Sequence, residues 1–189
     1  MISPDDVCAV IVTRGNVDLG PILATLPYSE IRVWNDRWRG SQGCYGRYLA
    51  AWPTCKPFTY YQDDDLLFTA HHELLAAYEP DKIVCNMPSP WYETTGYDIL
   101  DQCLVGAGSI MDSSIPYPAI DRYLNTYPAD NLFFDYVDVA VGMLTPYTRL
   151  DLGYQVLPYA SEPGRIYTTP GAAERKAEMQ RRVMELRGR

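Results

Sequence analysis

Three consecutive aspartates, Asp63, Asp64 and Asp65, directly follow residues 58–62, an aromatic-rich run typical of a buried β-strand. Adjacent carboxylates repel one another, which raises the pKa of at least one of them unless a cation lies nearby. Mg²⁺ or Mn²⁺ removes this conflict, because it binds one or two carboxylates and completes its octahedral shell with water and phosphate oxygens. Alternate residues of a strand-to-loop turn can face the same side. We therefore predict a divalent cation on Asp65 and Asp63, with Asp64 on a ligand hydroxyl or a bridging water. A solvated acidic loop is the competing interpretation.

Two further polar clusters follow predicted strands. A β-branched run leads into Thr13 and Arg14, and a shorter strand leads into Asn35 and Asp36. In open parallel sheets, ligands bind beyond the carboxyl ends of the strands. Three polar clusters in equivalent places therefore predict a binding site at this edge, although Asn35 and Asp36 also suit a simple turn.

The second half of the chain adds two carboxylates on a predicted helix. Asp130 is a suitable N-cap for a helix over 130–144, whose apolar residues recur at helical spacing. Asp135 and Asp138 lie one turn apart on the other side, where a carboxylate can act as a general base; a solvated helix face is the alternative. The glycines of the predicted strand 102–111 let a ligand or the backbone approach closely, or serve only for packing.

Strands and helices alternate along the chain, which predicts an α/β fold with an open, mostly parallel sheet flanked by helices. A basic, amphipathic helix is expected to end the chain. We expect strands at 7–13, 31–34, 58–62, 82–86, 102–111 and 156–157. We expect helices at 19–26, 45–52, 69–78, 130–144 and 172–186. Residues 40–46, 88–96 and 161–171 are expected to form loops.

The composition limits the classes of function. The 189 residues are 47% hydrophobic, which fits one domain with a sizeable core. The formal net charge of −8 makes direct binding to a DNA backbone unexpected, because that binding needs Lys and Arg near the phosphates. No apolar run reaches the roughly 18 residues that span a bilayer, and the start lacks a secretion signal, so we expect a cytoplasmic protein without a membrane partner. The five widely spaced cysteines suit buried thiols better than disulfides or a zinc site.

The ordered set of motifs resembles the GT-A fold glycosyltransferases, in particular small, family-2-like enzymes that use nucleotide sugars. The diagnostic of that fold is an aspartate motif, D-x-D, and the aspartate triplet resembles it at the end of a strand. The later glycine-containing strand of this chain resembles the acceptor-side strand of the family. The acidic segment that follows it here resembles the acidic helix that comes next in the family. The matching segments, in chain order, are Thr13-Arg14, Asn35-Asp36, Gly46-Arg47, Tyr60–Asp65, Val105–Ile110 and Phe134–Ala140.

The resemblance implies a metal-dependent glycosyltransferase that moves a sugar from a nucleoside diphosphate sugar to an acceptor hydroxyl. It implies Mn²⁺ or Mg²⁺ on Asp63 and Asp65, and a general base at Asp138, with Asp135 as the alternative. The donor is expected to contact a set of polar residues at the strand ends and in the later loop. These are Thr13, Arg14, Asn35, Asp36, Arg47, Asp63, Asp64 and Arg165.

The chain departs from the family at its end. Many relatives place a C-terminal histidine on the metal, whereas the last histidine here is His72. We expect either that the metal binds weakly or that Arg165 and Tyr167 take over part of that role. The resemblance also divides the chain into a catalytic domain and the final helix. The catalytic domain covers 1–171, with a nucleotide-sugar half at 1–87, an acceptor half at 88–160 and a closing loop at 161–171, and the helix covers 172–189.

Two other classes of function fit the same residues. A nucleotidyltransferase also uses paired aspartates at strand ends, and a catalytically inactive module of this fold would only bind carbohydrate or protein. The acceptor stays open among a protein side chain, a glycan, a small molecule and a modified DNA base. The donor sugar and inversion or retention at the sugar carbon also stay open.

Overall fold

A six-stranded mixed sheet forms the centre of the computed structural model, which describes residues 2–36, 42–54, 56–89, 92–93, 97–158 and 165–188. The strand order is β2-β1-β3-β6-β5-β7. β6 is antiparallel to both of its neighbours, and the other pairs are parallel. The predicted mostly parallel α/β sheet is therefore confirmed. The strands are β1 (Val7–Thr13), β2 (Glu30–Asn35), β3 (Phe58–Asp63), β5 (Ile83–Asn86), β6 (Ala107–Asp112) and β7 (Tyr147–Leu150).

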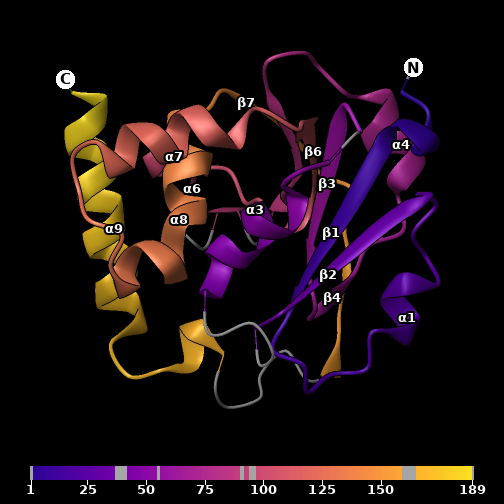
Figure 1. The fold of residues 1–189 in the computed structure, drawn as a ribbon, viewed down its shortest axis with the longest axis horizontal. Helices are drawn as coiled ribbons and strands as arrows, with labels where there is room; N and C mark the ends of the chain where they lie inside the picture. The colour runs from indigo at the N-terminus through magenta and orange to yellow at the C-terminus, as the bar shows by residue number, and fades with distance from the viewer. Residues whose placement is uncertain are drawn as a thin grey trace.

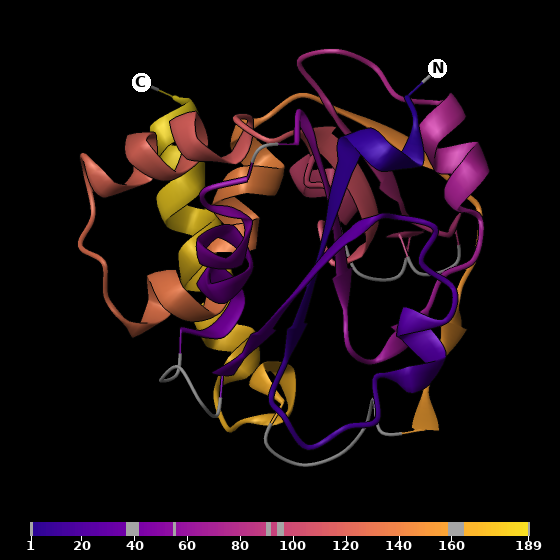
Figure 2. The same cartoon turned by 45° about the vertical axis from the view of Figure 1, so that its right-hand side comes forward.

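Helices cover both faces of this sheet and make three layers (Figures 1 and 2). One face carries α3 (Gly46–Ala51), α6 (Tyr97–Leu100), α7 (Pro116–Leu124), α8 (Asn131–Leu144) and α9 (Ala172–Arg187). The other face carries α1 (Gly20–Leu23) and α4 (His71–Ala76). Short 3-10 helices in the described residues include η1 (Pro4–Asp6), η2 (Gly43–Tyr45) and η4 (Ile166–Thr168). A separate two-stranded sheet pairs β4 (Leu66–Leu67) with β8 (Gln155–Val156).

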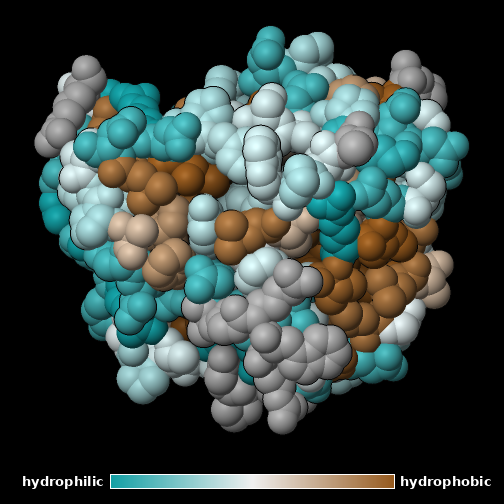
Figure 3. Space-filling model, in the orientation of Figure 1, coloured by the Kyte–Doolittle hydropathy of each residue, from teal (hydrophilic) through white to brown (hydrophobic). Residues whose placement is uncertain are grey.

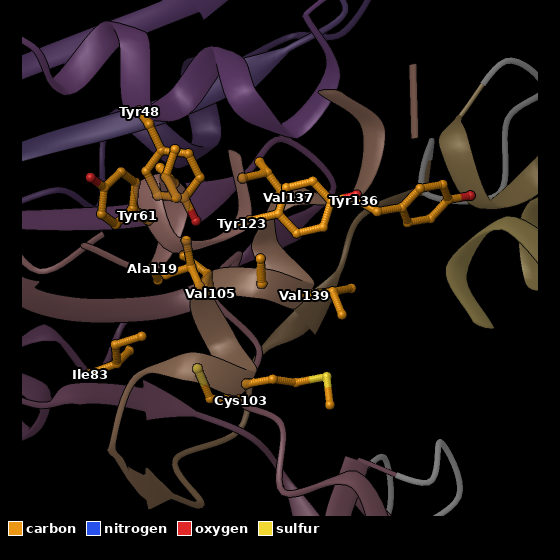
Figure 4. Packing of buried hydrophobic residues seen from close by; sticks show 14 of the residues in the cluster. Tyr48, Tyr61, Ile83, Cys103, Val105, Ala119, Tyr123, Tyr136, Val137 and Val139 are labelled. Carbon is orange, nitrogen blue, oxygen red and sulfur yellow. The ribbon is translucent and has the colours of Figure 1, made fainter. Parts of the chain in front are cut away.

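The alternation of side chains along the strands divides the core in two. In β1, Cys8 and Val10 pack toward α3 and α8, whereas Val7 and Ala9 pack toward α4. Figure 4 shows the larger half, in which the ring of Tyr48 from α3 meets that of Tyr61 from β3, their centroids 5.5 Å apart. Because both faces of the sheet are buried, β1 reads as a continuous apolar run as far as Val12.

The sheet register brings three strand ends together. Thr13 at the end of β1 pairs with Asn35 of β2, and Val12 pairs with Asp63 of β3. Parallel pairing makes the carboxyl ends of β1, β2 and β3 meet at one edge of the sheet, at the lower side of Figure 1. This is the edge at which the sequence predicts a site.

Several elements differ from the prediction. The sequence analysis does not predict α7 or β7. Helix α7 begins at Pro116, and β7 begins just after Pro146. A proline is tolerated at the start of a helix because the N–H groups of the first turn have no intrahelical partner. The predicted helices 19–26 and 69–78 are shorter, as α1 and α4. β8 covers Gln155–Val156 and joins the small sheet instead of the central one.

The final helix uses much of its positive charge inside the molecule. α9 packs on α8 and begins and ends within one residue of the prediction. Arg182 pairs with Asp130 and Glu178, and Arg187 donates to the carbonyl oxygens of Leu100 and Met143. The bonds of Arg182 to Asp130 and of Arg187 to the two carbonyl oxygens thus hold the helix to the domain.

The surface shows where apolar side chains stay uncovered. Figure 3 shows apolar residues on the right, over β2 and α1, where Leu23, Ile31 and Val33 are exposed, and a second apolar group on the left, over the helical layer. Within the described residues, no helix has the length and apolarity needed to cross a membrane.

Four cysteines are free thiols; Cys8, Cys85 and Cys103 are buried as expected, and Cys55 lies outside the described residues.

A buried histidine gives the fold a pH dependence. His71 packs among aromatic rings, with Nδ1 3.3 Å from the hydroxyl oxygen of Tyr28, whereas His72 is exposed. Burial lowers the pKa of His71 to about 4. The unfolded chain therefore binds more protons than the folded chain between the unfolded pKa, about 6.5, and the folded pKa.

We expect the free energy of unfolding to fall as the pH drops through that window, with His71 contributing up to about 3 kcal/mol of the change. His71→Phe, which keeps an aromatic ring, should flatten the slope, and His72→Gln should leave it unchanged. Urea unfolding at several pH values measures both slopes. An unchanged slope in His71→Phe would contradict the assignment.

Candidate functional site

A pocket of about 270 Å³ opens at the carboxyl ends of β1 and β3. Its wall combines positive and negative side chains from six segments that are far apart in sequence. The charged residues in the wall are Arg14, Asp36, Arg47, Asp63, Asp64, Asp65, Asp135 and Arg165, and Val12, Thr13, Gly43, Cys44, Ile166 and Tyr167 complete it. Five aspartates and three arginines thus face one space.

One buried arginine joins the two sides of this pocket. Nη2 of Arg47, from α3, lies 2.6 Å from Oδ1 of Asp63, and Nη1 lies 3.2 Å from Oδ2 of Asp138, from α8. The Arg47 side chain is only 3% exposed, and that of Asp138 is 21% exposed. A buried cation between two carboxylates is held far more firmly than a surface ion pair. The network fixes α8 relative to the end of β3.

Tyr48 completes the environment of Asp138. Its hydroxyl donates to Oδ1 of Asp138 at 2.7 Å, so each oxygen of this carboxylate has a partner. Burial raises the pKa of Asp138, and the charge of Arg47 and the bond from Tyr48 oppose that shift. Asp138 is therefore a positioned counter-charge for Arg47.

Asp64 and Asp65 share a second arginine. Nη1 of Arg165 lies 3.1 Å from Oδ1 of Asp64 and 3.0 Å from Oδ2 of Asp65. Burial and the charge of Asp63 raise the pKa of Asp65 to about 6, although Arg165 opposes the shift. This grouping differs from the strand alternation that we predicted, because the chain turns at Asp64 and Asp65 and separates them from Asp63.

Asp36 organises the rim of the pocket. Its Oδ1 accepts hydrogen bonds from the indole nitrogen of Trp34 and the backbone N–H of Gln42, and Oδ2 accepts from the N–H of Gly43. A Cβ on Gly43, whose φ is +50°, would lie 2.7 Å from the carbonyl oxygen of Phe134. Asp36 thus holds the start of η2 at the end of β2, and its carboxylate serves as a structural acceptor there.

Asp135 differs from Asp138 in its surroundings. Asp135, from α8, lines the pocket directly, whereas Asp138 is not among its lining residues. Burial raises its pKa, Arg175 opposes the shift and Asp36 adds to it. A carboxylate with a raised pKa that faces a pocket is a stronger proton acceptor than one already bound by an arginine and a tyrosine.

Gly106 explains one feature of the predicted glycine-containing strand. A Cβ at Gly106 would lie 2.1 Å from Oδ2 of Asp63, and the Gly106 carbonyl oxygen accepts from the N–H of Asp63 at 2.7 Å. The group that approaches Gly106 closely is thus the Asp63 carboxylate, and a side chain at position 106 would collide with it.

Gly106→Ala should displace the Asp63 carboxylate and destabilise the protein by about 1–3 kcal/mol, the usual cost of overpacking. Gly188→Ala is a matched control, because its Cβ would meet nothing closer than 3.9 Å. Gly106→Ala should cost less in an Asp63→Ala background than in the wild type, because the carboxylate that the new Cβ would meet is absent there. Thermal and urea unfolding measure these changes, and a Gly106→Ala variant as stable as Gly188→Ala would contradict this account.

The structure brings most of the predicted site residues to the pocket. Thr13, Arg14, Asp36, Arg47, Arg165 and all three triplet aspartates line it. Asn35 instead lies with its amide against Gly15, whose Cβ would be 2.5 Å from Oδ1 of Asn35. The sequence analysis did not identify Tyr48 or Cys44 as site residues. No local pattern marks Tyr48, because Asp138, to which its hydroxyl donates, lies 90 residues away.

The donor set fits a small, hard cation held by two carboxylates. Among the described residues, no group of three or more His, Cys, Asp or Glu is arranged to hold a metal ion. Two carboxylates suffice for Mg²⁺ when water and phosphate supply the remaining oxygens. Oδ2 of Asp64 is buried without a hydrogen-bond partner in the described part of the chain, and the Asp64 side chain is 5% exposed. An orphaned carboxylate oxygen beside Asp65 is the kind of atom that such a cation satisfies.

Neither the protein-family models nor the curated proteins compared with this sequence give a match. The function is therefore argued from the geometry of the pocket.

Proposed function

We propose that the chain is a metal-dependent glycosyltransferase, which moves a sugar from a nucleoside diphosphate sugar to an acceptor hydroxyl. The observation that carries the proposal is the mixed charge of the pocket, in which three arginines and five aspartates converge. A site for a simple anion needs no aspartates, and a site for a simple cation needs no arginines. A diphosphate joined to a polyhydroxylated sugar needs both, because guanidinium groups bind phosphate oxygens and carboxylates bind hydroxyls and a cation.

Each side chain has a role in this proposal. Arg14 and Arg165 bind phosphate oxygens, Thr13 and Asp36 border the nucleoside end, and Arg47 holds Asp63 toward the sugar. Mn²⁺ or Mg²⁺, when bound, supplies positive charge to the departing diphosphate. Asp65 and Asp64 would hold it, because Oδ2 of Asp64 has no hydrogen-bond partner in the described part of the chain.

The transfer step uses Asp135 as general base. The acceptor oxygen attacks the anomeric carbon, and its proton passes to the Asp135 carboxylate. The bond from the anomeric carbon to the diphosphate oxygen breaks, and its electron pair stays on the diphosphate. The resemblance alone ranks Asp138 first, but Asp135 lines the pocket whereas Asp138 is bound by Arg47 and Tyr48. We therefore assign Asp138 to the positioning of Arg47.

Thermal-shift measurements with a nucleotide panel in Mn²⁺ test the donor class. We expect at least one nucleoside diphosphate sugar to raise the melting temperature, and Asp65→Ala to abolish the shift. A preference for nucleoside triphosphates would favour a nucleotidyltransferase. Binding of a nucleotide sugar without any release of nucleoside diphosphate would favour an inactive binding module.

A further inference from the structure

Arg165 joins two carboxylates through a single nitrogen atom. Its Nη1 lies 3.1 Å from Asp64 Oδ1 and 3.0 Å from Asp65 Oδ2, and its side chain is 7% exposed. We propose that the Arg165 guanidinium occupies the position of the divalent cation, so that cation and guanidinium compete for Asp64 and Asp65. The inference rests on the proposed function for the identity of the cation site.

Distance and charge oppose simultaneous occupancy of the two oxygen atoms that Nη1 contacts, Asp64 Oδ1 and Asp65 Oδ2. Mg²⁺ lies about 2.0–2.1 Å from its oxygen ligands, so an ion bound to the same two atoms would lie close to van der Waals contact with Nη1. Two positive charges at that separation in a largely buried site repel strongly, because little water screens them. Cation entry therefore requires the Arg165 side chain to leave.

The contact of Arg165 with the aspartates suits exchange. A guanidinium binds a carboxylate most firmly through two parallel hydrogen bonds, whereas here one nitrogen serves two carboxylates. The second oxygen of Asp64 stays without a hydrogen-bond partner in the described part of the chain. The pair of aspartates is thus held together by Arg165 but incompletely satisfied by it.

The backbone of Arg165 is fixed, so only its side chain needs to move. The carbonyl oxygen of Arg165 accepts from both the N–H and the hydroxyl of Thr168, each at 2.9 Å, at the start of η4. Arg165 also lines the pocket, where a diphosphate would offer its guanidinium a new partner. A rotation of the side chain carries its charge from the carboxylates to the phosphates.

This exchange couples the cation to the donor. Without a diphosphate, the cation must displace Arg165 and binds weakly. With a diphosphate present, Arg165 has another anion to bind, and the cation enters more easily. Coupling of this kind is reciprocal, so the cation must tighten diphosphate binding by the same factor.

Binding of Mn²⁺ alone, followed by the electron paramagnetic resonance signal of the free ion, tests the competition without nucleotide. Arg165→Gln should bind Mn²⁺ roughly tenfold more tightly than the wild type, within the usual range for coupled sites. Arg175→Gln is the matched control, because it removes the same charge from a nearby arginine that bonds to Thr169 and Pro170. Its Mn²⁺ affinity should equal that of the wild type.

Arg165→Met retains the aliphatic packing of the side chain and repeats the test if Arg165→Gln does not fold. Equal Mn²⁺ affinity in the wild type and the folded Arg165 variant would overturn the inference, as would an equal gain in Arg175→Gln. Adding Asp64→Asn should remove the gain. Because no nucleotide is present, a gain in Mn²⁺ affinity without any binding of nucleotide sugars would refute the proposed function and leave the competition standing.

Discussion

Replacing Asp135 by asparagine should lower the rate of sugar transfer by about 10²- to 10⁴-fold, the usual contribution of a general base, while donor affinity stays near that of the wild type. The amide cannot accept the acceptor proton, but it preserves the shape of the pocket wall. Steady-state rates and calorimetric donor binding, measured on the same preparation, separate the two effects. In the wild type, the rate should fall as pH drops through the raised pKa of Asp135, because only the carboxylate accepts a proton.

Asp138→Asn is the informative comparison for this prediction. It removes the negative charge opposite Arg47 and should reduce the melting temperature, because both oxygens of Asp138 are used in buried contacts. Asp135→Asn should leave the melting temperature unchanged or raise it. If Asp135→Asn transfers sugar at the wild-type rate and Asp138→Asn is stable but inactive, Asp138 is the base and our assignment is wrong.

Replacing Arg47 by methionine should destabilise the protein by about 2–4 kcal/mol, a little less than the loss of a fully buried ion-pair partner because the Asp63 side chain is 36% exposed. Methionine fills much of the space but leaves Asp63 and Asp138 without the shared cation. Chemical denaturation measures the loss. Arg181→Met, which breaks two surface ion pairs on α9, should change stability little.

A double-mutant cycle identifies the cause of this loss. Adding Asp138→Asn to Arg47→Met removes the charge that the first substitution strands, so the double variant should be more stable than the two single losses predict. Strictly additive losses would show that Arg47 acts through packing alone. The two variants that lack Arg47 should also lose donor binding, since Arg47 no longer holds the Asp63 carboxylate in place.

The first strands of the sheet could be predicted from sequence because short runs rich in β-branched and aromatic residues end in polar clusters. β1 matches its predicted range residue for residue, and the N-cap of α8 is the predicted Asp130, whose side chain accepts from the N–H of Phe133 at 3.0 Å. α7 was missed because its sequence opens on prolines, and β7 because a four-residue edge strand has too few residues to show a period.

Most residues that line the site were predictable from the sequence, but the pairing of its arginines with its aspartates was not. Strand ends converge by the topology of a parallel sheet, so Thr13, Arg14 and the triplet meet in one pocket. Which arginine binds which aspartate depends on the path of the chain after β3, and local spacing does not encode it. The attachment of Asp138 to Arg47 likewise depends on how α8 packs against η2 and the start of α3 in the shared apolar core, which local spacing does not encode.

Release of free nucleoside diphosphate from nucleotide sugars in the presence of Mn²⁺ tests the central claim most directly. We predict that the wild-type protein releases nucleoside diphosphate from at least one donor, that a suitable acceptor increases the rate, and that Asp65→Ala and Asp135→Asn suppress it. If the wild type releases none from any donor of a broad panel, or if Asp65→Ala releases it at the wild-type rate, the pocket at the end of β3 is not a glycosyl-transfer site.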